Sequence, residues 1–479
     1  MKLLFVASEC APFVKTGGLA DVIGAVPKSL TAKGMGVKVL LPGYPSLAPL
    51  MKRAKVVAKF KQLFGGPARV LSARAEGLDL LMIDSPHLYD RVGSLYVDAD
   101  GADWTDNHLR FGALSYVGAE VARGAIKGWQ PRLVHAHDWQ AGLVAAYLAQ
   151  DQAYTPPVIT TIHNIAFQGV FPASTLGQLG LDKSLFTPEG VEYWGKVSFL
   201  KAGLALSHRV TTVSPSYANE LLTPEFGMGL EGLLQMRQKE LSGILNGIDT
   251  EIWDPSNDPA LPAPYSARGT KRKARSKTKV QKFFGLDSSA SGPLFCVISR
   301  LTTQKGLDLL ANCLQGLVAR DATLAVLGTG DRALERVFRQ AADEFPGRVG
   351  THIGYNEDLS HLLQGGADAI LIPSRFEPCG LTQLYGLRYG TLPIVARTGG
   401  LADTVIDANE AALATECATG VQFAPVTETM LDVAIGRACD LFKQPEVWQG
   451  MMRRAMRHPV GWDKSADAYL DLYTDLIDS

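Results

Sequence analysis

The stretch Lys15-Thr-Gly-Gly-Leu-Ala-Asp21 occurs a second time, with one basic residue exchanged for another, as Arg397-Thr-Gly-Gly-Leu-Ala-Asp403. Glycine lets backbone amides approach a ligand closely because it has no Cβ. Apolar, helix-compatible residues follow each glycine pair, so each stretch is expected to open a helix. Amides at a helix start, beside a cation, favour an anion. Two such loops predict two α/β halves that face each other across a cleft. The alternative is that both are plain strand-to-helix turns.

The composition argues against several function classes. The chain has 479 residues, which suits about two to four domains. Its 47 Lys and Arg balance 48 Asp and Glu, so neither nucleic acid nor an anionic membrane is an expected partner. A basic run at residues 271–277 is interpreted as the solvated start of a surface helix. A nucleic-acid patch and a targeting signal are the alternatives. No apolar run reaches the roughly 18 residues of a transmembrane helix.

The cysteines indicate a reducing compartment. The six cysteines are scattered, without a CxxC pair or a Cys/His ligand spacing, so we expect reduced thiols and no zinc site. The apolar N-terminus, residues 1–7, is too short for a secretory signal and fits a buried first strand. A cytoplasmic protein is therefore predicted.

Short apolar, β-branched runs alternate with longer helical patterns, which predicts parallel sheets covered by helices on both faces. We expect two doubly wound, Rossmann-like domains. The predicted strands lie at residues 3–7, 37–41, 80–83, 133–135, 158–162 and 209–213, and again at 294–298, 323–327, 349–353, 369–372 and 392–395.

Turn signals at Asn246-Gly247 and Asp254-Pro255 mark the change of domain. We expect an N-terminal domain over residues 1–243 and a C-terminal domain over 244–458. The segment 459–479 is expected to return to the first domain as an amphipathic helix over 465–477.

Polar residues that follow a strand matter most, because ligands of open α/β sheets bind beyond the carboxyl ends of the strands. Arg300 and Lys305 stand five residues apart after an apolar strand. A guanidinium fork and a point charge together suit a diphosphate. The alternative is a pair of surface cations.

Histidines follow two further strands. His163 could act as a general base, a hydrogen-bond donor to a sugar, or a core histidine. His135 and His137 alternate on one strand, so both could face one side. Metal ligation by them is the less favoured interpretation, because no third ligand stands at a suitable spacing.

Glu377 follows the strand predicted at 369–372. Gly380, Leu381 and Thr382 would start the next helix and present amides to an anion or to sugar hydroxyls. The alternative is a capping turn with a buried carboxylate.

Together these motifs resemble the bacterial glycogen synthases, a glycosyltransferase family that includes plant starch synthases. The resemblance runs from residue 3 to about residue 470. It implies the GT-B fold and transfer of glucose from ADP-glucose to the non-reducing 4-hydroxyl of an α-1,4-glucan, with retention of configuration. The matching stretches are residues 15–21, 135–140, 161–169, 246–249, 298–306, 353–357, 373–383 and 397–405.

The resemblance also implies catalytic roles. Arg300 and Lys305 would hold the donor diphosphate and stabilise the leaving ADP. Glu377 would lie near the transferred sugar or its ribose-phosphate environment. His163 would bind the 6-hydroxyl side of glucose, and Asp138 would line the sugar site.

It implies donor contacts as well. The Lys15 loop, with the amide of Gly18, would close on the diphosphate, and Tyr355 would stack on adenine. The remaining implied contacts go to the sugar and phosphate, from Asn246, Cys379, Gly380, Leu381 and Thr382.

Many retaining relatives carry a second Glu eight residues after the first, and this chain has Tyr385 there. We therefore expect an ion-pair-like displacement on one face of the sugar instead of a pair of carboxylates. Neither a metal nor a cofactor is expected, because two cations can stabilise the developing charge.

Three alternatives stay open at this stage. A phosphorylase would need a lysine that carries pyridoxal phosphate, and no motif supports one. A non-catalytic glucan-binding or regulatory module would not need Arg300, Lys305, His163 and Glu377. A UDP-glucose-dependent transferase would use the same fold and loops.

Overall fold

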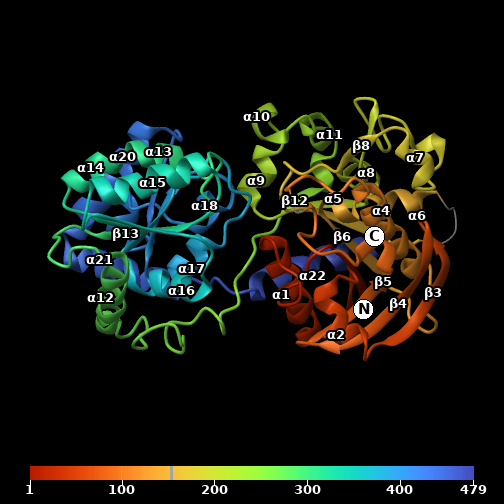
Figure 1. The fold of residues 1–479 in the computed structure, drawn as a ribbon, viewed down its shortest axis with the longest axis horizontal. Helices are drawn as coiled ribbons and strands as arrows, with labels where there is room; N and C mark the ends of the chain where they lie inside the picture. The colour runs from red at the N-terminus through yellow and green to blue at the C-terminus, as the bar shows by residue number, and fades with distance from the viewer. Residues whose placement is uncertain (99, 151–154, 479) are drawn as a thin grey trace. The chain divides into compact units, whose positions relative to one another are not determined.

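The apolar runs form strands, each within two residues of its expected limits. The computed structural model describes residues 1–98, 100–150 and 155–478 (Figure 1). It divides into Met1–Asn246 with Trp462–Ser479, here called the N-unit, and Gly247–Gly461, here called the C-unit. The domain limits expected from the sequence, after residues 243 and 458, each lie three residues before these observed limits.

Within the described residues, the N-unit holds a nine-stranded sheet in the order β12-β11-β7-β6-β1-β2-β5-β4-β3. From β12 to β5 all neighbours are parallel. The strands are β1 (Lys2–Val6), β2 (Gly36–Pro42), β3 (Lys55–Leu63), β4 (Gly66–Ala75), β5 (Leu78–Asp84), β6 (Leu133–His137), β7 (Val158–Ile162), β11 (Arg209–Thr212) and β12 (Leu241–Gly243).

One edge of this sheet corrects the expectation of purely parallel pairing. β4 pairs antiparallel with both β5 and β3. The β3–β4 turn is tight, with left-handed backbone at Phe64 (φ 45°) and Gly65 (φ 100°). Most of β3 is exposed or half-buried. An exposed edge strand carries no continuous apolar run, so the strand prediction missed it.

Helices cover both faces of the N-unit sheet (Figure 1). α1 (Gly18–Ala32) and α22 (Asp463–Asp478) lie on one face. The other face is covered by α4 (Asn107–Ala122), α6 (Leu143–Ala149) and α8 (Phe199–Leu206). α22 is tied to the sheet by a 2.7 Å hydrogen bond between Tyr473 OH and His135 Nδ1. The helix expected at 465–477 therefore forms and packs on the N-unit.

Smaller elements complete the N-unit. A three-stranded sheet of order β8-β10-β9 is built from β8 (Val170–Pro172), β9 (Glu192–Tyr193) and β10 (Lys196–Ser198). The short helices are α2 (Ala48–Met51), α3 (Pro86–Tyr89), α5 (Asp138–Ala141), α7 (Thr175–Gln178), α9 (Pro215–Glu220), α10 (Pro224–Gly227) and α11 (Glu231–Met236).

The C-unit sheet is parallel throughout, in the order β15-β14-β13-β16-β17-β18. Only the last of its strands was not expected. The strands are β13 (Leu294–Ile298), β14 (Thr323–Gly328), β15 (Val349–Ile353), β16 (Ala369–Ile372), β17 (Leu392–Ala396) and β18 (Val421–Phe423).

Helices cover both faces of this sheet too (Figure 1). One face carries α13 (Leu307–Asn312), α14 (Leu314–Ala319), α15 (Arg332–Glu344) and α20 (Glu428–Phe442). The opposite face carries α12 (Lys273–Phe284), α16 (Glu357–Gly366) and α17 (Thr382–Tyr389). The unit also contains α18 (Gly399–Thr404), α19 (Glu410–Ala414) and α21 (Pro445–Arg457).

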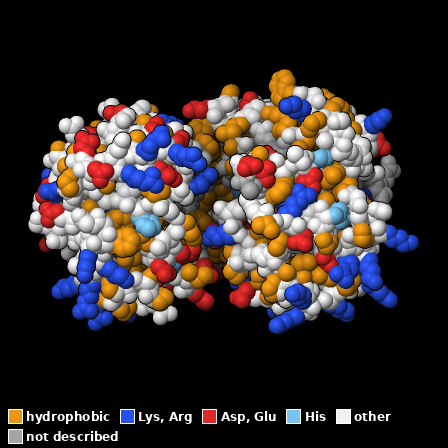
Figure 2. Space-filling view, viewed as in Figure 1, with side chains coloured by type: hydrophobic (Ala, Val, Ile, Leu, Met, Phe, Trp, Pro, Cys, Tyr) orange, Lys and Arg blue, Asp and Glu red, His pale blue; other side chains and the backbone are white. Residues whose placement is uncertain are grey.

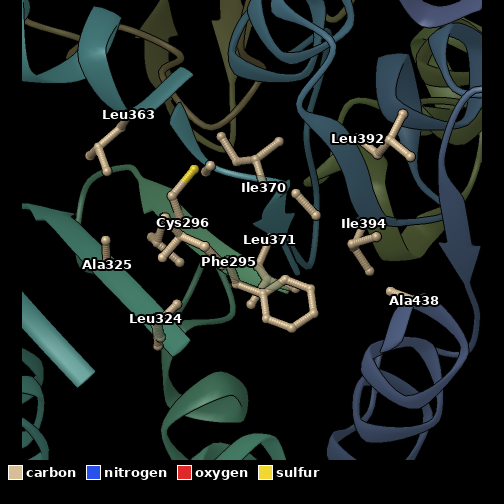
Figure 3. Packing of buried hydrophobic residues seen from close by; sticks show 14 of the residues in the cluster. Phe295, Cys296, Leu324, Ala325, Leu363, Ile370, Leu371, Leu392, Ile394 and Ala438 are labelled. Atoms are coloured by element: carbon tan, nitrogen blue, oxygen red, sulfur yellow. The ribbon is translucent and has the colours of Figure 1, made fainter. Parts of the chain in front are cut away.

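Buried side chains from both faces of the C-unit sheet form its core (Figure 3). Phe295 and Cys296 of the central strand β13 point to opposite faces, and both are fully buried. A strand buried on two sides needs an unbroken apolar run. This is why the strand at 294–298 was predicted with its exact limits.

The basic run at residues 271–277, which extends into the first turns of α12, is only partly solvated, and this corrects its interpretation. Figure 2 shows basic side chains gathered over α12. Lys273, however, is buried, and its ammonium group donates to Thr391 Oγ1 (2.7 Å) and to the carbonyl oxygens of Gln364 and Tyr389. This lysine fixes α12 to the C-unit. None of the helices within the described part of the chain has the length and apolarity to cross a bilayer.

Candidate functional site

A buried carboxylate holds the first Thr-Gly-Gly loop. Glu9 lies just beyond β1, and its Oε2 accepts hydrogen bonds from the amides of Thr16 (2.5 Å) and Gly17 (3.3 Å). Its Oε1 accepts from Thr16 Oγ1 (2.5 Å) and from the hydroxyl of Tyr96. The amides that were expected to attract an anion are therefore partly engaged by one from the protein itself. This contact fixes the loop to the end of β1.

Lys15 stands at the outer side of this loop. Its Nζ lies 2.8 Å from Asp21 Oδ1, and the two side chains are 43% and 24% exposed. An exposed ion pair contributes little to stability, so Lys15 can exchange Asp21 for a ligand anion at small cost. Gly18 is the first residue of α1, as expected.

Asp138 and His163 follow the neighbouring parallel strands β6 and β7, and the structure brings them together. Asp138 Oδ1 accepts a 2.7 Å hydrogen bond from the amide of His163 and a longer one, 3.5 Å, from Asn164. Asp138 has a left-handed backbone (φ 55°), a strained geometry typical of functional turns. Burial raises the pKa of its carboxyl to about 7.

The histidines form a buried group. His135 and His137 face the same side of β6, as expected, with ring centroids 4.1 Å apart. His137 Nδ1 lies 3.0 Å from His163 Nε2, and His135 Nε2 lies 2.5 Å from Thr161 Oγ1. Burial lowers the pKa of His135 to about 3, so the ring is neutral. The described residues contain no group of three His, Cys, Asp or Glu that could hold a metal ion.

In the C-unit, Lys305 and Glu377 form a close pair. Lys305 Nζ lies 2.5 Å from Glu377 Oε2, and Ser374 Oγ donates to the same oxygen at 2.9 Å. Glu377 is only 8% exposed. The pair is possible because the loop at 299–306 packs directly on the turn after β16. Gly306 adopts φ 67°, and a Cβ there would collide with the carbonyl oxygen of Pro373.

Three other expected residues stand apart from this pair. Arg300 is exposed, and its guanidinium forms no ion pair within the described residues. Tyr355 is 78% exposed, and its hydroxyl donates to Glu357. Asn246, in the N-unit, is buried, and its Oδ1 has no hydrogen-bond partner among the described atoms.

The turn after Glu377 leads into α17. Gly380 takes a left-handed backbone (φ 71°), and Thr382 is the first residue of the helix. Gln383 Nε2 donates to the carbonyl oxygens of Cys379 and Gly380, at 2.9 Å each. These bonds fix the segment from Cys379 to Thr382, including the helix start that was expected to face a sugar or phosphate.

The second Thr-Gly-Gly loop supports this turn. The Gly400 amide donates to the carbonyl oxygens of Glu377 (3.1 Å) and Pro378 (3.2 Å). Gly399 adopts φ 43°, and a Cβ there would collide with the carbonyl oxygen of Glu377. The Gly400 amide therefore donates to backbone carbonyl oxygens of the neighbouring turn. In the first loop the Thr16 and Gly17 amides donate to a carboxylate instead, so the two loops differ in their hydrogen bonds.

Comparison with known proteins decides the family. Residues 2–236 match the family model of the starch synthase catalytic domain, and residues 279–432 match that of the glycosyl transferases group 1. A glycogen synthase of Roseobacter denitrificans is 64% identical over 477 residues, which cover 100% of both chains. The chain belongs to the bacterial glycogen synthase family.

Further relatives agree. A glycogen synthase of Mesorhizobium japonicum is 52% identical over 100% of this chain and 99% of its own. Among solved structures, the catalytic domain of starch synthase IV from Arabidopsis thaliana, bound to ADP and acarbose, is similar with a TM-score of 0.87 and 32% identity. That match covers 100% of this chain and 99% of the other. The two α/β units are thus those of a GT-B glycosyltransferase, which confirms the expected fold.

Several residues of this glycogen synthase family member were not predicted to act in the site. Ser374 and Gln383 lie inside the motif around Glu377, so their short spacing to it was a usable signal. Glu9 lies three residues after the end of β1, so its place near a strand end was a usable signal. Tyr96 is 87 residues from Glu9, and no local pattern links the two.

Proposed function

We propose that the protein elongates glycogen by transferring glucose from ADP-glucose to the non-reducing 4-hydroxyl of an α-1,4-glucan, with retention of configuration. Family membership supports the glucosyl transfer. The pairing of Lys305 with the buried Glu377, next to the start of α17, is the observation on which the site assignment rests. The contact with this buried carboxylate fixes the direction of the lysine side chain.

The donor diphosphate is assigned to Arg300 and Lys305. Arg300 is exposed and unpaired within the described residues, so its planar fork is available to a diphosphate. Lys305 adds a point charge from the same loop. Preorganised cations stabilise the negative charge that develops on the leaving ADP.

Other donor contacts are proposed by residue. Lys15 and the Gly18 amide add charge and a donor to the diphosphate, and Tyr355 offers its exposed ring to adenine. The sugar is assigned to Asp138, His163 and Asn246 in the N-unit and to Glu377, Cys379, Gly380 and Leu381 in the C-unit. The phosphate is assigned to Thr382.

The reaction uses one face of the sugar. The bond between the anomeric carbon and the phosphate oxygen breaks, the bond to the acceptor 4-oxygen forms, and the acceptor proton passes to the leaving phosphate. Tyr385 supplies no second carboxylate. Its ring is stacked on Trp253 at 3.7 Å between centroids, so it serves packing.

A cytoplasmic location is also proposed. All six cysteines are free thiols, as expected in a reducing compartment. The proposed partners are ADP-glucose and the glucan, without nucleic acid or membrane.

A labelled-sugar assay tests the proposal. The protein is supplied with glycogen and with either ADP-glucose or UDP-glucose, and label in the polymer is measured with and without EDTA. We expect incorporation from ADP-glucose at the same rate in EDTA. Incorporation only from UDP-glucose would contradict the donor assignment. Glucan binding without transfer would indicate a non-catalytic module. Loss of turnover in EDTA, restored by Mg²⁺, would reject the metal-free mechanism.

A further inference from the structure

An exposed tryptophan stands at the tip of a hairpin in the N-unit. β9 and β10 pair antiparallel and are joined by Trp194 and Gly195. The Trp194 side chain is 81% exposed. Burial of a large aromatic side chain stabilises a fold, and the exposed Trp194 does not contribute this stabilisation.

The backbone of Trp194 is unfavourable as well. Trp194 has φ 50° and Gly195 has φ 73°, so both residues of the turn are left-handed. Such two-residue hairpin turns favour Asn-Gly, and a bulky residue there is strained. Exposure and strain at one residue indicate that this side chain does not serve folding.

The hairpin is held rigidly. The Gly195 amide donates to Glu192 Oε1 at 2.7 Å, which closes the turn. The hydroxyl of Tyr193 donates to the carbonyl oxygen of Met228 at 3.2 Å. The indole of Trp194 therefore extends into solvent from a hairpin that is held by hydrogen bonds. Because the hairpin backbone is already fixed, little conformational entropy is lost when a ligand covers the indole.

The hairpin also packs against the segment that follows His163 in the chain. Residues 164–169 connect His163 to β8, and β8 pairs with β10. Phe171 of β8 packs against Trp139, with ring centroids 5.9 Å apart, and Trp139 follows Asp138. Gly169 lies so close to Trp139 that a Cβ would collide with the indole. Trp194 thus has a fixed position in the unit that contains Asp138 and His163.

We propose that Trp194 is a stacking platform for the α-1,4-glucan, at a place separate from the residues assigned to glucose transfer. This inference rests on the proposed function, which supplies the glucan. A neutral sugar chain has no charge for ion pairing, but its C–H faces pack well on a flat, rigid aromatic ring. A polymeric acceptor also extends beyond the reacting end, so contacts away from the site can hold it.

The variant Trp194→Asn tests the platform without damage to the hairpin, because it creates the preferred Asn-Gly turn. Its melting temperature should equal or exceed that of the parent. Retardation in native gels that contain glycogen measures glucan affinity without catalysis. We expect about tenfold weaker affinity, and we expect Trp194→Phe to retain most of it. Phe283→Ala removes another exposed aromatic ring, 54% exposed on α12 in the C-unit, and should bind glycogen as the parent does.

Parental glycogen affinity in a folded Trp194→Asn variant would overturn the platform. A change of oligomeric state in that variant, with unchanged glycogen affinity, would also overturn it and assign Trp194 to a protein contact. The transfer assay on the unmodified protein separates the two proposals. If transfer fails but Trp194→Asn still weakens glycogen retention, the platform stands and the proposed function falls.

Discussion

Lys305 Nζ lies 2.5 Å from Glu377 Oε2, in a pair whose side chains are only 19% and 10% exposed. A buried carboxylate that loses its cation becomes an uncompensated charge. Of the contacts that the described residues make to that oxygen, the hydrogen bond from Ser374 would remain. The pair therefore fixes the direction of the Lys305 side chain, which we propose contacts the donor, and gives Glu377 a compensating cation.

Lys305→Gln should lower kcat by about 10²- to 10³-fold, because the leaving ADP loses a preorganised positive charge. Glycogen affinity should change far less, because a neutral glucan does not need this charge. Steady-state rates at saturating ADP-glucose, together with native gels that contain glycogen, measure both effects.

Lys277→Gln is the matched control. It breaks a lysine–aspartate pair in the same unit, at 2.7 Å from Asp368 Oδ2, away from Glu377. We expect parental kcat in this variant. A parental kcat in Lys305→Gln would reject the role of Lys305 in departure of ADP.

The second Thr-Gly-Gly loop gives a prediction that compares equivalent glycines. Gly399→Ala places a Cβ against the carbonyl oxygen of Glu377 at φ 43°, and the left-handed backbone alone costs about 1–2 kcal/mol. Gly17→Ala meets nothing within 4 Å at an extended φ of −157°. Thermal melts should show marked destabilisation for Gly399→Ala and little for Gly17→Ala. Equal shifts in melting temperature would contradict the supporting role of the second loop.

The sequence predicts best those parts of the fold where burial dictates residue type. The strands at 158–162, 294–298 and 369–372 form with their exact limits, because strands buried on both faces need near-continuous apolar, β-branched runs. β3 was missed because it is an exposed edge strand. Lys273 was judged solvated because a basic run gives no sign of the carbonyl oxygens that tertiary folding brings to it.

The candidate site follows the same division. Lys305 and Glu377 could each be placed after a strand, but their contact depends on Gly306 packing against Pro373 across two loops. Likewise, the Glu9 carboxylate that bonds to the first loop also accepts a hydrogen bond from Tyr96, which lies in a distant segment. Local spacing predicts which strand end a residue occupies. It does not predict the partner that tertiary packing selects.

Two buried groups, His135 in β6 and Asp138 just after it, predict opposite effects of pH. Burial lowers the pKa of His135 to about 3, below its unfolded value of about 6.5. Since the unfolded chain takes up the proton first, His135 should cost stability as pH falls through the range from about 6.5 to 3. Burial raises the pKa of Asp138 to about 7, above its unfolded value of about 3.9. Asp138 should therefore cost stability as pH rises from about 4 to 7.

Urea unfolding between pH 4.5 and 7.5 checks this, with a slope of at most about 1.4 kcal/mol per pH unit for each group. His135→Gln should reduce the acid-side loss, and Asp138→Asn should increase the net rise of stability with pH. Parental slopes in both variants would show that neither group titrates as described.

Lys15→Ala and Arg397→Ala test whether the repeated loops differ in function. Among the described residues Lys15 forms an exposed ion pair with Asp21 alone, so we propose that it is available to the donor diphosphate. Arg397 is exposed, but in its loop the Gly400 amide already donates hydrogen bonds to the carbonyl oxygens of Glu377 and Pro378. A charge-assisted hydrogen bond contributes about 1.5–3 kcal/mol. Lys15→Ala should therefore raise the KM for ADP-glucose about tenfold or more, and Arg397→Ala should leave it nearly unchanged. Equal increases in KM would mean that both loops bind the donor, and the asymmetry seen in their hydrogen bonds would not extend to function.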